Sequence, residues 1–267
     1  KGVRKTMSIT DEGEYGKKQI KTLEMIWGEG FLSPGGSQEI DLVLNNKSIK
    51  NLTILDIGCG AGSAAFHFIQ NHSVGHVTAV DVEKEVIDRA NELKSKYSFE
   101  KLVDFKVIDP GPLEFNDASF DMVFSKDTFL HIKDKESLAE ELFRVIKPGG
   151  FVCVSDWMRV DDNYPSQLMQ EYIKMEGLSM NMCSLERYSK ALKSAGFENI
   201  FLRDRNAWYL KVAKKELSDL QSIYNKKLID ILGKDDAEST IKIWEKMVEV
   251  LEIGEHRPGH FYAEKPL

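Results

Sequence analysis

Short apolar runs alternate with amphipathic stretches through the middle of the chain. Five runs rich in Val, Ile and Phe have the length of strands: 53–57, 77–81, 103–108, 120–124 and 150–155. Apolar residues at helical spacing occupy 61–70, 83–97 and 135–146. Strands and helices that alternate in this way predict a parallel sheet with helices on both faces. The segment Lys147-Pro-Gly-Gly150 is predicted to end a helix and turn into the fifth strand.

The flanking parts of the chain have a different pattern. A short helix at 18–27 precedes a turn-rich segment from Gly28 to Gly36, and the methionine-rich residues 157–185 have the pattern of a loop. The rest of the chain predicts helices at 185–195, 209–232 and 238–252 and strands at 198–203 and 259–263. The fold class expected is therefore α/β: a doubly wound, mostly parallel seven-stranded sheet with a helical lid.

This pattern divides the chain into three parts. Residues 1–36 are expected to be an N-terminal lid segment, and residues 37–205 the α/β core. Residues 206–267 are expected to be a helical cap inserted before the closing strand.

Composition narrows the classes of function. The 267 residues carry 36 Lys and Arg against 43 Asp and Glu, so a surface for nucleic acid is disfavoured. No apolar run approaches the roughly 20 residues of a membrane span, and no membrane insertion is expected. Cys59, Cys153 and Cys183 form no Cys-x-x-Cys pair, which argues against a structural zinc site and favours the cytoplasm. No metal is expected.

The strongest chemical signal is a glycine-rich segment after the first predicted strand. Leu55-Asp-Ile-Gly-Cys-Gly-Ala-Gly62 places Gly58, Gly60 and Gly62 where a ligand can approach the backbone closely. Asp81 ends the second strand, where a carboxylate can accept hydrogen bonds from ribose hydroxyls. Asp109 ends the third predicted strand and could meet an adenine amine.

Dinucleotides and S-adenosylmethionine both use such an arrangement. The dinucleotide fingerprint requires a third glycine where this chain has Ser63. Asp56, directly before the loop, would repel a pyrophosphate but suits the cationic side of S-adenosylmethionine. A dinucleotide, or a loop that only makes a turn, remains as an alternative.

Taken together, these motifs resemble the class I S-adenosylmethionine-dependent methyltransferases. The resemblance rests on the glycine loop, the acidic end of strand two, Phe120-Asp121 and Leu142-Phe-Arg-Val-Ile-Lys-Pro-Gly-Gly150, and it covers about residues 50–205. It implies a Rossmann-like methyltransferase fold and S-adenosylmethionine as the cofactor. The implied cofactor contacts are Asp56, Gly58, Gly60, Gly62, Asp81, Val82, Asp109 and Pro110.

A narrower resemblance involves the flanking segments. Tyr15 and the segment 27–36 are similar to the N-terminal lid of the phosphoethanolamine N-methyltransferases, and 259–261 to their closing strand. Residues 124–131 resemble that group and the sarcosine/dimethylglycine N-methyltransferases. The resemblance implies that Tyr15 and His131 form a catalytic dyad and that Asp127 contacts the substrate amine. It also implies that Ser33 and Lys126 contact the cofactor.

The residues expected to contact the methyl acceptor depart from the pattern of the phosphoethanolamine N-methyltransferases. Tyr172 matches a phosphate-contacting tyrosine, but Glu176 and Leu178 stand where the group has an arginine and a tyrosine. Trp157 likewise replaces a tyrosine. A phosphate requires cationic and hydroxyl donors, so these departures disfavour phosphoethanolamine. Trp157 and Tyr172 are the expected substrate-binding residues.

The function expected is transfer of a methyl group from S-adenosylmethionine to a small-molecule amine. Alternatives are O- or C-methylation of a small metabolite, phosphoethanolamine N-methylation itself, and a non-catalytic S-adenosylmethionine-binding module. His131, with an ordinary pKa of about 6.5, suits the role of base. A structural role remains the alternative for His131, Asp127 and the methionine-rich segment.

Overall fold

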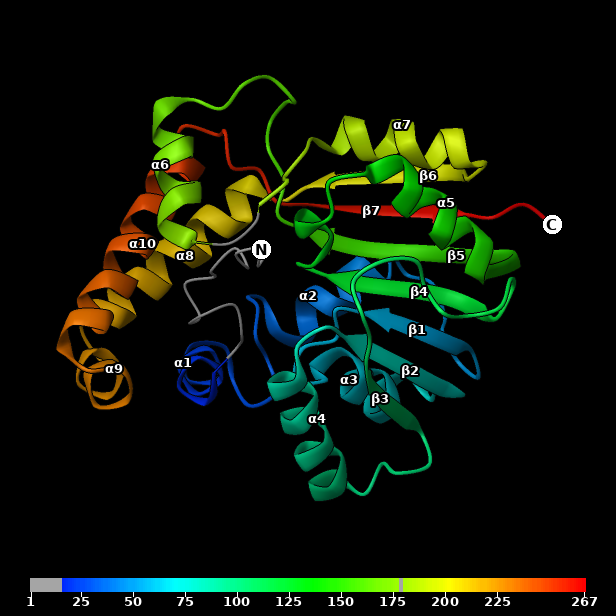
Figure 1. The fold of residues 1–267 in the computed structure, drawn as a ribbon, viewed down its shortest axis with the longest axis horizontal. Helices are drawn as coiled ribbons and strands as arrows, with labels where there is room; N and C mark the ends of the chain where they lie inside the picture. The colour runs from blue at the N-terminus through cyan, green and yellow to red at the C-terminus, as the bar shows by residue number, and fades with distance from the viewer. Residues whose placement is uncertain (1–15, 178–179) are drawn as a thin grey trace, which may run out of the picture.

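A computed structural model describes residues 16–177 and 180–267. Within these residues seven strands form one sheet in the order β3-β2-β1-β4-β5-β7-β6 (Figure 1). β7 runs antiparallel to β5 and β6, and the pairs among β1 to β5 are parallel. The predicted fold class is confirmed. The strands are β1 Thr53–Ile57, β2 His76–Asp81, β3 Val103–Val107, β4 Phe120–Lys126, β5 Ile146–Asp156, β6 Glu198–Asp204 and β7 Gly259–Glu264.

Both faces of the sheet are buried because successive strand residues point to opposite sides. Ile54 belongs to one apolar core and its neighbour Leu55 to the other. One face packs against α2 Gly36–Val43, α3 Ser63–His72 and α4 Lys84–Tyr97. The other packs against α5 Lys135–Val145 and α7 Leu185–Ala195.

The remaining helices form a cap beyond the carboxyl ends of the parallel strands (Figure 1). They are α1 Lys17–Trp27, α6 Gln167–Glu176, α8 Asn206–Gln221, α9 Asn225–Leu232 and α10 Lys234–Glu252. The buried carboxylate of Glu216 on α8 accepts hydrogen bonds from the indoles of Trp27 at 2.6 Å and Trp244 at 3.1 Å. The start of the described chain is thereby joined to the C-terminal helices in one cap.

The prediction of a loop over 157–185 is wrong for α6. Ser166 caps this helix by accepting the Met169 N–H, and Gly177 ends it in a left-handed conformation. Met169 and Tyr172 face the core of the cap, so tertiary burial supports the helix. Leu168, Met169, Tyr172 and Ile173 do follow helical spacing, so the sequence carried a signal for this helix that the prediction of a loop overlooked.

The structure differs from the predicted elements in four further places. Helix α2 was not expected, and the helix predicted at 209–232 is two helices, α8 and α9. Lys147 to Gly150 lie inside β5. The pairing register between β4 and β5 shifts between Phe120 and Met122 of β4, so these residues form an irregularity within the strand and not a turn before it. β3 ends at Val107, two residues before Asp109. None of the described helices combines the length and apolarity needed to cross a bilayer.

Candidate functional site

The glycine loop after β1 is shaped by close packing against the end of β4. Gly58 and Gly60 have φ of 72° and 53°, in the region that favours glycine. A Cβ on Gly58 would stand 2.0 Å from Oγ1 of Thr128, so no larger residue fits there. Gly62 is the N-cap of α3, with φ of 92°. The loop therefore brings backbone to the ligand edge of the sheet, as the sequence predicts.

Two carboxylates lie beside this loop: Asp56, which is buried, and Asp81, which is half-buried. Asp56 is 1% exposed, and its Oδ2 has no hydrogen-bond partner among the described residues. Burial and the nearby charge of Asp81 raise the pKa of Asp56 to about 8. An unpartnered buried carboxylate is costly, and a cationic ligand group at this place would compensate it.

Asp81 holds the loop in place at the end of β2. Its Oδ2 accepts the Gly60 N–H at 2.9 Å, and its Oδ1 accepts the Glu83 N–H at 3.0 Å. Burial raises the pKa of Asp81, while these N–H groups and the charge of His131 act to lower it. Val82, Asp109 and Pro110 follow β2 and β3 at the same edge and are accessible from solvent.

Lys126, the last residue of β4, joins the segment that contains Ser33 and Pro34 to the sheet. Its Nζ donates to Ser33 Oγ at 2.7 Å and to the Pro34 carbonyl at 2.9 Å, and lies 2.8 Å from Asp127 Oδ2. Asp127 has φ of 54°, and its N–H donates to the Ser155 carbonyl on β5. Three of the predicted site residues, Ser33, Lys126 and Asp127, therefore meet in one cluster.

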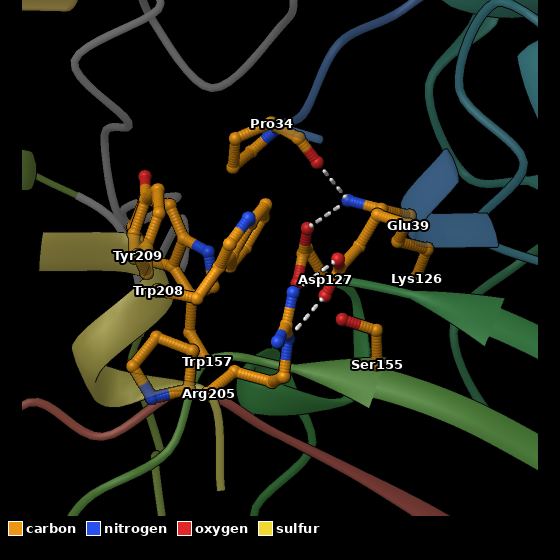
Figure 2. Close-up of a pocket in the computed structure, with 10 residues that line it drawn as sticks. Pro34, Glu39, Lys126, Asp127, Ser155, Trp157, Arg205, Trp208 and Tyr209 are labelled. Carbon is orange, nitrogen blue, oxygen red and sulfur yellow. Dashed lines mark hydrogen bonds and ion pairs between the residues drawn. The ribbon is translucent and has the colours of Figure 1, made fainter. Parts of the chain in front are cut away.

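A pocket extends from this cluster toward the cap (Figure 2). Its lining residues are Pro34, Glu39, Lys126, Asp127, Ser155, Trp157, Arg205, Trp208, Tyr209 and Pro258. In Figure 2 the rings of Trp208 and Tyr209 lie on one side, and Lys126 and Ser155 on the other. The pocket combines an aromatic wall from the cap with charged groups from the sheet.

The carboxylate of Glu39, in the lining of this pocket, contacts two basic side chains. Its carboxylate accepts two hydrogen bonds from Arg205, at 2.9 and 2.7 Å, and lies 2.7 Å from His260 Nε2 on β7. Burial by itself would raise the pKa of Glu39, but the bonds from His260 and Arg205 outweigh it and lower the pKa to about 2. Glu39 is therefore ionised at neutral pH, and Arg205 is already paired.

Aromatic residues of the cap continue behind the pocket. The ring of Trp157 lies 6.1 Å from that of Tyr209 and 5.3 Å from that of His256. Tyr172 lies 5.7 Å from His256, and its buried hydroxyl forms no hydrogen bond among the described residues. Burial raises the pKa of the neighbouring Glu176 to about 7. Trp157 reaches the pocket, and Tyr172 and Glu176 lie outside its lining.

His131 stands apart from this pocket. It ends the 3-10 turn η1 Phe129–His131 and is exposed, on the side of Asp81. Tyr15, its predicted partner, lies outside the described residues. Sequence reasoning did not single out the pocket residues Glu39, Arg205, Trp208 and Tyr209. The only signal available for Arg205, Trp208 and Tyr209 was a run of aromatic and charged residues directly after the predicted strand 198–203, and Glu39 carried no local signal.

A cluster of metal-ligand type lies away from this site. His67 and His72 on α3 both place Nε2 near Asp41 Oδ1 on α2, at 2.6 and 2.7 Å. Both imidazoles are hydrogen-bonded to the same carboxylate oxygen of Asp41. This arrangement accounts for the cluster as a contact between α2 and α3.

The glycine loop after β1, the aspartates Asp56 and Asp81 beside it and the parallel sheet together define the class of protein. The family model described as "Methyltransferase domain" matches residues 48–196, more than half of the chain, and the chain belongs to this family. The resemblance drawn from the sequence motifs is thereby confirmed.

Individual relatives extend the likeness beyond this domain. "Phosphoethanolamine N-methyltransferase 1" of Arabidopsis thaliana is 32% identical over 96% of this chain and 51% of its own length. The structure of Haemonchus contortus phosphoethanolamine N-methyltransferase 2 in complex with S-adenosyl-L-methionine matches with a TM-score of 0.89 and 25% identity, over 100% of this chain and 61% of that one. A Galdieria sulphuraria structure named as a sarcosine dimethylglycine methyltransferase matches with a TM-score of 0.79 and 18% identity, over 93% and 97%. The chain spans about half the length of the plant relatives it matches.

Proposed function

We propose that this chain transfers a methyl group from S-adenosylmethionine to the nitrogen of a small amine. The observation that carries the proposal is the unpartnered buried Oδ2 of Asp56, beside the glycine loop and the carboxylate of Asp81. A ligand with a positive charge and ribose hydroxyls would satisfy both carboxylates. The Haemonchus relative, which is in complex with S-adenosyl-L-methionine, supports the same cofactor here.

The residues around the loop and the lid would hold the cofactor. When bound, it supplies an electrophilic methyl group on its sulfonium, and S-adenosylhomocysteine remains after transfer. Asp81 would accept hydrogen bonds from the ribose, and Asp56 would face a cationic group. The full set that we assign is Ser33, Asp56, Gly58, Gly60, Gly62, Asp81, Val82, Asp109, Pro110 and Lys126.

An amine must lose a proton before its lone pair can attack. We assign this step to His131, whose ordinary pKa lies near neutrality, with Tyr15 closing the lid over it. Asp127 would attract and orient the ammonium, because its carboxylate lies at the pocket. The N-terminal segment up to Gly36 would act together with α6, α8, α9 and α10 as the lid, since Glu216 joins α1 to the C-terminal helices. The predicted division at residues 205 and 206 does not separate lid from core, because β7 belongs to the sheet and α6 to the cap.

The charges in the pocket favour an acceptor without a phosphate. Its two cationic lining residues are already paired, Lys126 with Asp127 and Arg205 with Glu39. A phosphate needs uncompensated cations or several donors, which these pairs do not offer. The rings of Trp157 and Tyr209 offer π faces to a methylated ammonium. Tyr172, which lies behind Trp157, would be a further residue of the part of the site that binds the amine.

The second candidate is phosphoethanolamine N-methylation, favoured by the names of the Arabidopsis and Haemonchus relatives. The two candidates are separated by measuring formation of S-adenosylhomocysteine from ethanolamine, phosphoethanolamine, glycine, sarcosine, dimethylglycine and small phenols. We expect turnover of an unphosphorylated amine. Efficient turnover of phosphoethanolamine would favour the second candidate, and turnover of phenols alone would mean O-methylation.

We also propose that the protein acts on a free small molecule in the cytoplasm, without nucleic acid. Cys59, Cys153 and Cys183 are free and buried, as is usual in a reducing compartment. Fractionation of cells that make the full protein would test this location. Recovery in an oxidising compartment would contradict it.

A further inference from the structure

The 3-10 turn that carries His131 is held by buried charged side chains. The Nζ of Lys135 donates to the carbonyl of Phe129 at 2.7 Å and to that of Ile132 at 2.5 Å, one on each side of the Leu130–His131 pair. From the other side, Asp156 Oδ1 accepts the Leu130 N–H at 3.2 Å. A cation and an anion therefore fix the backbone directly around His131.

The two carbonyls between these contacts are bound by a third segment. The N–H of Asn181 donates to the Leu130 carbonyl at 2.6 Å, and its side-chain amide donates to the His131 carbonyl at 3.2 Å. Four consecutive carbonyls, from Phe129 to Ile132, thus each accept a hydrogen bond from a group outside the turn. A short turn next to a sheet does not require such complete external support.

The charged groups in this network are costly to bury. Lys135 is 2% exposed and Asp156 is fully buried, and lysine is rarely buried to this extent unless paired. The two do not form an ion pair; the hydroxyl of Tyr188 donates to Asp156 Oδ2 at 2.6 Å, and Lys135 Nζ lies 5.2 Å from the Tyr188 ring centroid. Both charged groups make hydrogen bonds to the backbone of the single turn that carries His131, so their burial fixes that turn.

We propose that Lys135 and Asp156 are positioning residues for His131, which they hold at the ligand edge through the backbone of its turn. The proposal rests on the proposed function in taking His131 as the base. Neither residue needs to touch the cofactor or the acceptor. Asn181 adds a connection from the α6–α7 segment of the lid, because the same turn is its hydrogen-bond partner.

The test uses variants that separate positioning from folding. Lys135→Met leaves Asp156 without its nearby cation, so this variant alone could lose stability. The double variant Lys135→Met/Asp156→Asn removes both charges and retains an oxygen acceptor for Leu130. Glu136→Gln is the matched control, because Glu136 on α5 pairs with Arg187 on α7 at the surface, next in sequence to Lys135. Asn181→Ala removes a single contact from a partly exposed residue and leaves the core intact.

Three quantities are measured on each folded variant: S-adenosylhomocysteine affinity by calorimetry, the ring signal of His131 by ¹H–¹³C NMR, and methyl transfer to the best amine of the screen above. We expect affinity within about twofold of wild type, a displaced or broadened His131 signal, and turnover lowered about 10²-fold in the double variant. Asn181→Ala should lower turnover several-fold without changing the unfolding temperature, and Glu136→Gln should change none of the three.

A wild-type His131 signal and wild-type turnover in the folded double variant would overturn the proposal. So would wild-type values in Asn181→Ala, if the double variant did not fold. Failure of the proposed function is distinguishable, because it would appear as full turnover in His131→Ala. The NMR comparison reports on the position of His131 in either case.

Discussion

The ammonium of Lys126 lies 2.8 Å from the carboxylate of its neighbour Asp127, and it also donates to Ser33 in the lid. This ammonium therefore pairs with a carboxylate that lines the pocket and ties Ser33 to the end of β4. The Lys126 charge is then not available to a phosphate, and Arg205 is likewise paired with Glu39. This arrangement leads to a prediction about the acceptor.

We expect phosphoethanolamine to be a poorer substrate than an amine without phosphate, judged by kcat/KM. Trp157→Ala should weaken the binding of a methylated amine by about 0.5–2 kcal/mol, because the π face is lost, and Trp157→Phe should weaken it less. The measurement is KM for each amine in the screen. A higher kcat/KM for phosphoethanolamine than for any other amine would contradict this reading.

Asp81→Ala should weaken S-adenosylmethionine binding by about 1–3 kcal/mol, through loss of charge-assisted hydrogen bonds. Part of the loss would come from the Gly60 N–H, which Asp81 holds in the free protein. Isothermal calorimetry measures the change. Asp104→Asn, at an exposed position on β3, is the control, and equal affinities of the Asp81 variant and wild type would place the ribose elsewhere.

Cofactor binding should release a proton near neutral pH. Burial and the charge of Asp81 raise the pKa of Asp56 to about 8, so this carboxyl is mostly protonated at pH 7 in the free protein. A cationic group placed beside Asp56 favours its ionised form and lowers that pKa, and the proton leaves. Binding enthalpies in phosphate and Tris buffers should therefore differ. The difference should disappear in Asp56→Asn; if it is absent in wild type, Asp56 does not face the cation.

His131→Ala should lower turnover by about 10²–10⁴-fold while cofactor affinity changes little, as expected for a positioned base. His76→Ala, at a half-buried histidine that lies next to Asp104 at the start of β2, is the control. A parallel loss of cofactor affinity and turnover would instead indicate that His131 supports the site structurally.

Glu176→Gln should stabilise the protein increasingly as pH rises from 5 to 8. Burial raises the pKa of Glu176 to about 7 in the folded state from 4.5, so the folded protein binds this proton more tightly than the unfolded chain. Its contribution to stability is full below pH 4.5 and is lost as pH rises through 7. Because Gln does not ionise, it escapes this loss, which amounts to at most about 3 kcal/mol.

Chemical denaturation at pH 5 and pH 8 measures this effect as the difference between variant and wild type. Glu171→Gln, on the exposed side of the same helix, should show no such growth. A Glu176→Gln effect that is equal at both pH values would mean that Glu176 ionises without penalty, for example through water.

The sequence by itself determined the core of the fold and its ligand edge. The strands at 53–57 and 77–81 were readable because their apolar side chains are local and continuous, and the structure has β1 and β2 there. Gly58, Gly60 and Asp81 were readable because a tight turn and a strand end have strict residue requirements. These signals depend on near neighbours in the chain.

Only the tertiary structure decided the pocket beside Lys126 and Asp127 and the cap. Glu39 meets Arg205 and His260 across more than 160 positions of sequence, and no local pattern indicates that pairing. Helix α6 owes its helical form to burial against α8 and α10, and Lys135 owes its role to carbonyls presented by a turn. Long-range packing places these groups together, so their partners and charge balance follow from the folded chain and not from residue spacing.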